Sequence, residues 1–311
     1  MRQPAGYTTA HHNGGSGFRK PWPSYQASSV STLLKARWST PKNFVPVTSL
    51  PEVDAVCISH DHYDYLDSDT LSKLNAKNKL LRYFCALGVK SVLTGLGIGI
   101  RDEQVTEMDW WDGISLKDEH VGSVELICTP AQHRSGRAPW NFDGTLWCSW
   151  ATKEPGDYGK RLFFAGDTGY CHINSDAQFS HHDAPHPPCP AFKEVGELHG
   201  PFDLALLPAG CFKPRSGQHS SPEDSLAIHR DMRSKKSIAM HYGTFRGAYS
   251  APYEPVTEPV ERRRKGAEAE GLNWDEVGLC DDGETVVVST YSTITIRIEA
   301  PSVVCNLIPQ F

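Results

Sequence analysis

The 311-residue sequence predicts an α/β or α+β sandwich. Short apolar runs rich in β-branched residues are interspersed with segments at helical spacing. Turn residues bound most of these runs, and the 26 glycines and 22 prolines indicate a loop-rich chain. The length is sufficient for one large domain or two small ones with a buried core. The order of the elements alone does not decide between the two fold classes.

The first fifty residues lack a clear periodicity, and Pro41, Pro46 and Pro51 interrupt this part of the chain. We therefore expect a poorly ordered leader over residues 1–50, with a short helix over 30–38 at most. Organised structure is expected from Val53 onward, where 53–59 form an apolar, β-branched run typical of a buried strand. A helix over 68–76 follows, with Ser68 as its N-cap and leucines at helical spacing.

The later elements follow from the same two signals. Apolar runs between turn residues predict strands, and Pro222 at a first helical position, followed by two acids, predicts a helix start. The predicted strands are 80–86, 123–129, 145–152, 161–165, 203–208 and 236–240, the predicted helices are 191–198, 222–233 and 258–270, and 285–298 is long and β-rich.

Composition excludes several classes of protein. The chain has 31 basic and 37 acidic residues, a net charge of −6, which disfavours a general nucleic-acid binder. The most apolar segment, 80–100, contains Arg82, Lys90 and several glycines, so it is a poor membrane helix. The nine cysteines form no CxxC pair, and no secretory signal is visible. We expect reduced thiols in an intracellular protein that is cytoplasmic or peripheral to an internal membrane and is not secreted.

The densest chemical signal directly follows the first predicted strand. His60, His62 and Asp64 alternate there, an arrangement that lets two neutral imidazoles and a carboxylate converge on a cation. A surface loop with scattered histidines is the alternative interpretation of this segment alone. Three later strand ends each offer one more ligand-type residue, namely His133, Asp167 and His241. Four such junctions together favour a metal site over coincidence.

These segments resemble a known family. HxHxD after a strand, followed by single His, Asp and His residues at later strand ends, is the pattern of the metallo-β-lactamase superfamily. The sequences of these segments are similar to those of one branch, the N-acyl-phosphatidylethanolamine-hydrolysing phospholipase D (NAPE-PLD) family, and to its fungal-type members. The resemblance runs from about residue 50 to 285, through the segments SHDHYDYLD, TPAQH, FFAGDTGYC, CPAFKEVGELHGPFDLALLPAG, QHSSPEDSLAIHRDM and MHYGTF.

The resemblance implies an αββα sandwich over residues 51–300 with a two-metal site, most simply two Zn²⁺ ions. His60, His62 and His133 would hold the first metal, Asp167 would bridge, and Asp64 and His241 would hold the second. A metal-bound hydroxide would attack the phosphodiester and release phosphatidic acid and an N-acylethanolamine. The implied catalytic residues are Asp64, Asp167 and His219, and the implied substrate contacts are Tyr63, Gln132 and His219.

The sequence departs from the family motif HxHxDH at its last position, which is Tyr65. The second metal thereby loses an imidazole, and a phenol with a pKa near 10 is an unusual ligand. The second metal would then bind weakly, or be a harder cation such as iron, or be absent. Asp61 and Asp67 are close enough in sequence to supply a replacement ligand.

Other departures concern whole segments. The family's first β-hairpin has no counterpart in residues 1–52, so we expect the sandwich to lack it. Residues 172–188, rich in proline and histidine, are expected to form an inserted loop. Residues 301–311 form a C-terminal tail, and the apolar end of the chain from Ser289 is a candidate to cover an exposed sheet edge.

The leading hypothesis is therefore a metal-dependent phosphodiesterase of the phospholipase D type, acting on N-acyl-phosphatidylethanolamine. One alternative is a hydrolase of another phosphodiester or of a lactone. Another is a non-catalytic descendant, which Tyr65 favours. The resemblance implies a phospholipid substrate, peripheral association with an internal membrane and a homodimer. The Arg-, Lys- and Ser-rich N-terminus weakly resembles a mitochondrial transit peptide.

Overall fold

The computed structural model describes residues 47, 50, 53–118, 122–157, 159–171, 187–213, 217–242, 254–280, 288 and 302–305. Nearly all of the expected leader, including the helix over 30–38, lies outside these residues. So do nearly all of the inserted loop and of the β-rich run at 285–298. Among the described residues no strand precedes Val53, the position at which the sequence predicts that organised structure begins.

The first sheet has four parallel strands in the order β10-β1-β2-β3. They are β1 (Val53–Ile58), β2 (Arg82–Ala86), β3 (Val105–Met108) and β10 (Ser302–Cys305). Residues at both ends of the described chain meet here, because β10 pairs with β1. The chain's end thus contributes a strand beside β1 and occupies that side of it.

The second sheet has six strands in the order β4-β5-β6-β7-β8-β9. They are β4 (Gly113–Asp118), β5 (Gly122–Thr129), β6 (Ser149–Lys153), β7 (Arg161–Phe164), β8 (Leu204–Pro208) and β9 (Ser237–Met240). Strands β4 to β7 pair antiparallel, and β7, β8 and β9 pair parallel. The parallel part brings the carboxyl ends of β7, β8 and β9 to one edge.

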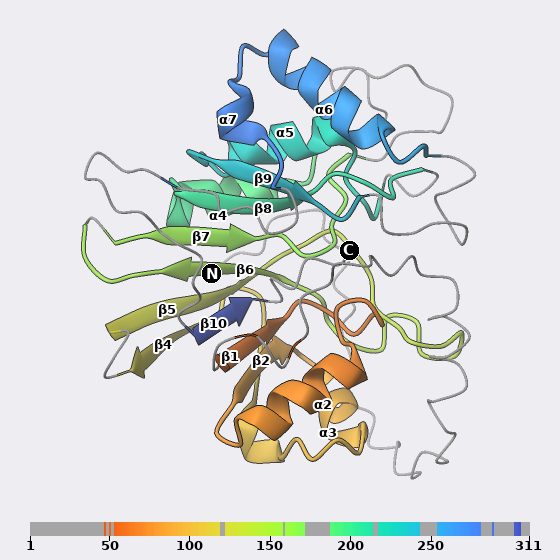
Figure 1. Cartoon of the computed structure of the whole chain (residues 1–311), viewed down its shortest axis with the longest axis vertical. Coiled ribbons are helices and arrows are strands. Elements are labelled where there is room, and N and C mark those ends of the chain that lie inside the picture. The colour runs from red at the N-terminus through yellow and green to blue at the C-terminus, as the bar shows by residue number, and fades with distance from the viewer. Residues whose placement is uncertain are drawn as a thin grey trace. The chain divides into compact units, whose positions relative to one another are not determined.

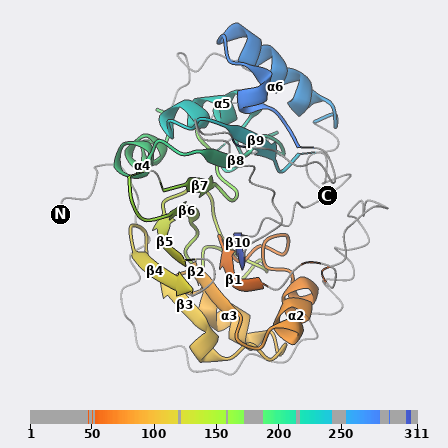
Figure 2. The same cartoon turned by 60° about the vertical axis from the view of Figure 1, so that its left-hand side comes forward.

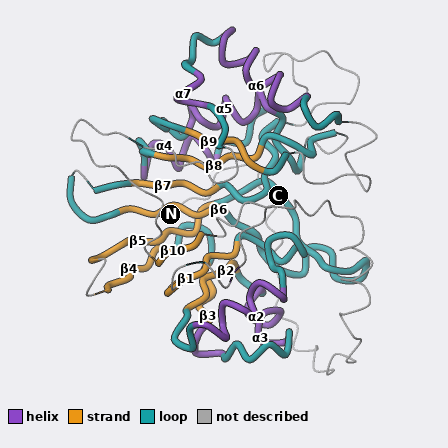
Figure 3. Tube along the Cα trace, in the orientation of Figure 1, coloured by secondary structure: helices purple, strands orange, loops and turns teal. Residues whose placement is uncertain are grey.

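Helices lie outside both sheets (Figures 1 and 2). Near the first sheet are α2 (Ser68–Lys77), α3 (Val89–Gly95) and the short η2 (Asp102–Gln104). Near the second are α4 (Ala191–His199), α5 (Pro222–Asp231), α6 (Glu258–Ala269) and α7 (Trp274–Val277). Helix α5 packs on β8, and α6 packs on α5. Helices, two sheets and helices give the predicted αββα arrangement. Figure 3 shows that loops gather along one side of the sheets.

The main core lies between the two sheets. Val56 and Phe84 from the first sheet share one buried cluster with Leu126, Trp150 and Phe164 from the second. Burying a large apolar side chain contributes about 1.5–3 kcal/mol relative to leaving it exposed. This shared core fixes the position of the loop after β1 relative to the loop after β7.

Two local predictions need correction, and some strands were missed. Helix α2 begins at Ser68, but its N-cap is Asp67, whose carboxylate accepts from the backbone N–H of Thr70 at 2.9 Å. Strand β6 begins only at Ser149, because residues from 145 onward belong to an irregular approach. Strands β3 and β4 were not predicted, since Thr, Glu, Lys and Gly dilute their apolar signal.

None of the helices described is long and apolar enough to cross a membrane.

Candidate metal centre

The loop after β1 places the first group of ligand-type residues. Strand β1 is almost wholly buried, and the chain turns sharply after it, with the backbone N–H of Leu66 donating to the carbonyl of His62 at 2.8 Å. The guanidinium of Arg137 then closes the loop from outside. One of its nitrogens donates to the carbonyls of Asp61 at 2.7 Å and Leu66 at 3.0 Å. Both ends of the loop are thereby tied to one side chain.

His133 enters the same space from the loop after β5. Its Nδ1 lies 2.9 Å from the carbonyl of Gln218. A carbonyl can only accept, so Nδ1 carries the proton and Nε2 presents its lone pair to the site. Such an outer hydrogen bond fixes the ring orientation of histidines that bind metals. His60 is held in a similar way, because its Nδ1 lies 2.9 Å from the hydroxyl of Ser59.

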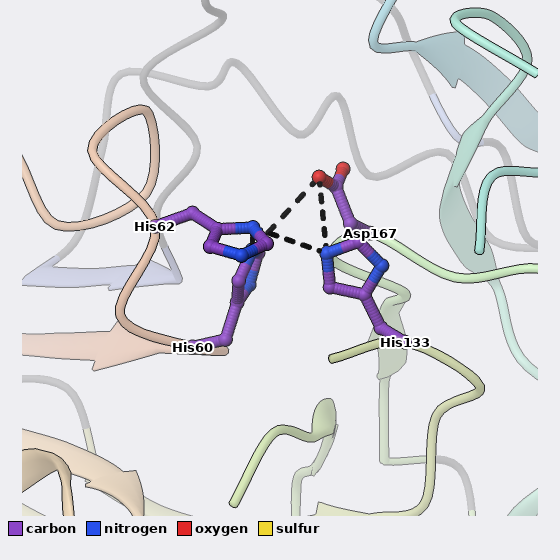
Figure 4. Close-up of side chains that lie close together, drawn as sticks. All are labelled: His60, His62, His133 and Asp167. Carbon is purple, nitrogen blue, oxygen red and sulfur yellow. Dashed lines mark hydrogen bonds and ion pairs between the residues drawn. The ribbon is translucent and has the colours of Figure 1, made fainter. Parts of the chain in front are cut away.

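Asp167 follows β7 through Gly166. This glycine has φ of 61°, and a Cβ there would lie 2.8 Å from the Cβ of Ser59. A larger residue would push the β7 loop away from the loop after β1, so glycine permits the approach. The carboxylate of Asp167 is thereby brought to the histidines (Figure 4).

The first four donor groups fit a zinc ion. Figure 4 shows the side chains of His60, His62, His133 and Asp167 pointing toward one another. Nδ1 of His62 lies 2.9 Å from Nε2 of His60 and 3.3 Å from Nε2 of His133. Oδ2 of Asp167 lies 3.6 Å from Nε2 of His133 and 3.9 Å from that of His60. Ligand atoms around tetrahedral zinc lie roughly 3.4 Å apart, and three imidazoles with one carboxylate are a typical zinc donor set.

Burial keeps the imidazoles of His60 and His133 neutral, the form that binds metal. Desolvation and the neighbouring rings, His62 first, hold the pKa of His60 well below its usual range. Desolvation and His62 likewise lower the pKa of His133 to about 3. Burial raises the pKa of Asp167 to about 6, against the opposing effect of His241. The carboxylate is therefore still ionised at neutral pH.

Asp64 and His241 lie on the other side of Asp167. Nε2 of His241 is 3.2 Å from Oδ1 of Asp167 and 3.7 Å from Oδ2 of Asp64. Burial opposes the charged imidazole, but Asp167 and Asp64 outweigh it and raise the pKa of His241 to about 9. His241 directly follows β9 with φ of 58°, a left-handed conformation that costs energy for a residue other than glycine.

Tyr65 also points into this side of the site. Its hydroxyl donates to Oδ1 of Asp167 at 2.6 Å, and its ring lies 4.6 Å from that of His60 between centroids. The two replacement ligands considered from the sequence are turned elsewhere. Asp61 accepts from the backbone N–H of Gly136 at 2.7 Å, and Asp67 caps α2. Both carboxylates support loops and do not face the donor atoms.

His219 comes from the loop before α5. Its ring lies parallel to that of His241, with centroids 5.2 Å apart and planes 8° apart. Its Nδ1 is 4.0 Å from Oδ2 of Asp167. One donor atom each from Asp167, His219 and His241 lie within 4.8 Å of one another, as do those of the first four residues. Asp64 belongs to neither group among the described residues.

Two predicted substrate contacts border the site. The ring of Tyr63 packs under the guanidinium of Arg137, 3.9 Å from its centre. The side-chain amide of Gln132 donates to the carbonyl of Gly217 at 3.0 Å and so links two loops of the site. Their contact with substrate stays a prediction. Arg137 was missed by the sequence analysis, because nothing in its local pattern indicates a contact with the loop after β1.

Comparison with known families and proteins agrees with this architecture. Residues 21–242 match the model of the beta-lactamase superfamily domain. Among solved structures, an isothiocyanate hydrolase from Delia radicum gut bacteria superposes with a TM-score of 0.53 at 18% identity, covering 79% of this chain and 82% of that one. This second likeness concerns the fold alone.

Two curated relatives have informative names. N-acyl-phosphatidylethanolamine-hydrolyzing phospholipase D 1 of Caenorhabditis elegans is 32% identical over 213 residues, which cover 66% of this chain and 54% of the relative. The mitochondrial N-acyl-phosphatidylethanolamine-hydrolyzing phospholipase D of Saccharomyces cerevisiae is 31% identical over 230 residues, 73% of this chain and 43% of the relative. The chain thus matches about half the length of these relatives.

Proposed function

This chain belongs to the beta-lactamase superfamily, and we propose that it is a metal-dependent phosphodiesterase that cleaves N-acyl-phosphatidylethanolamine to N-acylethanolamine and phosphatidic acid. The observation that carries the proposal is the convergence of His60, His62, His133 and Asp167 at the ends of separate strands. No nucleophilic serine or cysteine is needed for such a reaction.

The residues divide the work between them. His60, His62 and His133 would hold one zinc ion, Asp167 would lie between the two ions, and Asp64 and His241 would face the second. When bound, zinc ions would lower the pKa of water and place positive charge beside the phosphate oxygens. The neutral imidazoles of His60 and His133 and the ionised carboxylate of Asp167 hold the lone pairs that such ions require. Asp64 and Asp167 are the proposed catalytic carboxylates, and a phosphate contact by His219 remains the expectation from sequence.

The names of two relatives support a phospholipid substrate. The loop that leaves His133 supports peripheral contact with a membrane, because Trp140 is 77% exposed and Phe142 is 58% exposed. Aromatic side chains favour the boundary between lipid and water. The guanidinium of Arg134 lies 4.6 Å from the ring centre of Phe142 and adds a positive group beside them. The mitochondrial relative supports an internal membrane as the place of action.

One observation favours a second candidate. Tyr65 occupies the position where the family motif has a histidine, and it donates to the central carboxylate. A non-catalytic protein that binds metal or lipid would keep the first four donors and tolerate this change. A hydrolase of another phosphodiester or of a lactone would keep the same donors too.

The test is hydrolysis of N-acyl-phosphatidylethanolamine vesicles by the zinc-loaded protein, with both products measured by mass spectrometry. The expected result is equal release of N-acylethanolamine and phosphatidic acid, lost in His60→Ala together with bound zinc. A parallel panel of other phosphodiesters and lactones identifies a different substrate. Zinc binding without turnover of any of them would favour the non-catalytic candidate and overturn the proposal.

A further inference from the structure

The second side of the site has an unusual donor arrangement. The loop after β1 contributes Asp64 there, but its next residue contributes a phenol that donates to Oδ1 of Asp167. The ligands that the sequence predicts for the second metal are then the carboxylates of Asp64 and Asp167 and the imidazole of His241. Only the last two share a cluster of close donor atoms, and the third member of that cluster is His219.

The position of His219 is set from both sides. The carbonyl of its neighbour Gln218 accepts from Nδ1 of His133. The hydroxyl of its other neighbour, Ser220, donates to the carbonyl of Thr168 at 2.7 Å. Ser221 then caps α5 by accepting from the backbone N–H of Asp224 at 3.0 Å. His219 is 8% exposed, so these contacts hold a buried imidazole against Asp167 and His241.

We propose that His219 is a ligand of the second metal ion, together with Asp167 and His241, in place of the imidazole that position 65 lacks. The inference rests on the proposed function only in requiring a two-metal site. Two imidazoles and carboxylate oxygen suit zinc. Donor atoms within 4.8 Å of one another need to approach by at most about 1.4 Å to reach tetrahedral spacing, a movement within the reach of side-chain rotation.

The competing role for His219 is contact with the substrate phosphate. The two roles differ in what is lost when the ring is removed. A phosphate contact affects hydrolysis and leaves the metal content unchanged. If His219 is a metal ligand, removing its ring also removes the second ion. An imidazole placed at position 65 should then restore that ion from the opposite side of Asp167.

The experiment compares the zinc content of four proteins by elemental analysis after zinc loading and desalting. They are the wild type, His219→Ala, Tyr65→His and the double variant. We expect two zinc ions per chain in the wild type, one in His219→Ala and two again in the double variant. Cobalt substitution gives an independent readout, because the visible absorption of the second ion should vanish and return in the same order.

His229→Ala is the matched control, because this histidine lies in α5 and belongs to neither donor cluster among the described residues. It should keep two zinc ions. Circular dichroism establishes that each variant is folded, and His219→Gln replaces His219→Ala if the alanine variant is not. Two zinc ions retained in the folded His219 variant, or one zinc ion in the wild type, would overturn the inference.

The same proteins separate this inference from the proposed function. The expected zinc contents without cleavage of N-acyl-phosphatidylethanolamine would leave the ligand assignment intact and remove the substrate. Cleavage by the wild type, with both ions retained in His219→Ala, would leave the substrate intact and assign His219 to the phosphate.

Discussion

The hydroxyl of Tyr65 donates a 2.6 Å hydrogen bond to Oδ1 of Asp167 in the interior of the metal centre. Burial, reinforced by the charges of Asp167 and Asp64, holds the pKa of Tyr65 well above its usual range, so the phenol remains a donor. The other oxygen of Asp167 faces His60 and His133. The central carboxylate is therefore shared between a protein donor and the proposed metal site.

Tyr65→Phe should destabilise the metal-free protein more than the zinc-loaded one. Without metal, the variant removes from the buried carboxylate of Asp167 one hydrogen-bond donor, a contact worth about 1.5–3 kcal/mol for a charged group, and leaves His241 as its neighbour. With zinc bound, the ion offsets much of that loss. Urea unfolding in the presence of EDTA and of zinc measures the difference. Equal losses in the two conditions would contradict this account.

Tyr83→Phe provides the matched control. Tyr83 is buried like Tyr65, but within the described part of the chain its hydroxyl has no hydrogen-bond partner. Removing that hydroxyl deletes no contact and should leave the free energy of unfolding unchanged or slightly increased, with or without zinc. A large loss in this variant would mean that removing a buried phenol is costly in general.

The sequence predicted the site better where the ligands follow strands than where loops support them. The alternation of His60, His62 and Asp64 after an apolar run carried most of the signal, and the structure brings the first two to His133 and Asp167. Arg137 could not be predicted, since it contacts the carbonyl of Asp61 across 76 residues of sequence. Every residue carries a backbone carbonyl, so the identity of the accepting residue does not indicate such a contact.

The dependence of prediction on local sequence patterns also explains which strands were predicted. The buried strands β1, β7, β8 and β9 were predicted to within about two residues, because continuous apolar runs mark them. Strand β10 illustrates the opposite case. Its place beside β1 depends on a pairing between segments nearly 250 residues apart in the chain, which no local pattern specifies.

Arg137→Lys should weaken zinc binding by about tenfold, the lower end of the range for residues that support metal ligands. Lysine keeps the charge but loses the planar guanidinium that stacks on Tyr63 and holds the donating nitrogen in place between the carbonyls of Asp61 and Leu66. The loop carrying His60 and His62 would then be less well ordered. Competition with a chelator measures the affinity. Arg134→Lys on the same loop, where the side chain pairs with Asp143 near the surface, should have little effect.

Trp140→Ala should reduce binding to phospholipid vesicles by about tenfold, because it removes the exposed indole that would lie at the boundary between lipid and water. Sedimentation with vesicles measures binding, and the difference in fluorescence between the wild type, which has eight tryptophans, and Trp140→Ala reports the surroundings of Trp140. Hydrolysis of a small water-soluble phosphodiester should not change. Leu198→Ala is the control, since Leu198 is 62% exposed on α4. Equal binding by wild type and Trp140→Ala would exclude this loop as the membrane contact.

His229 should make the protein less stable as the pH falls below about 6.5. The ring is buried in α5, and burial with the charges of Arg263 and Arg230 lowers its pKa to about 4. Above the unfolded pKa both states are neutral and the residue has no effect on pH dependence. Between the two pKa values the unfolded chain binds a proton that the folded chain does not, so stability decreases as the pH falls.

The loss should reach about 2 kcal/mol at pH 5 and level off below pH 4. His229→Leu removes this proton uptake, so the difference in unfolding free energy between variant and wild type should move in favour of the variant from pH 7 to pH 5. Urea unfolding of both proteins under the same zinc concentration measures it, and any common loss of metal cancels. Parallel stability curves for the two proteins would mean that His229 is protonated in the folded state over this range.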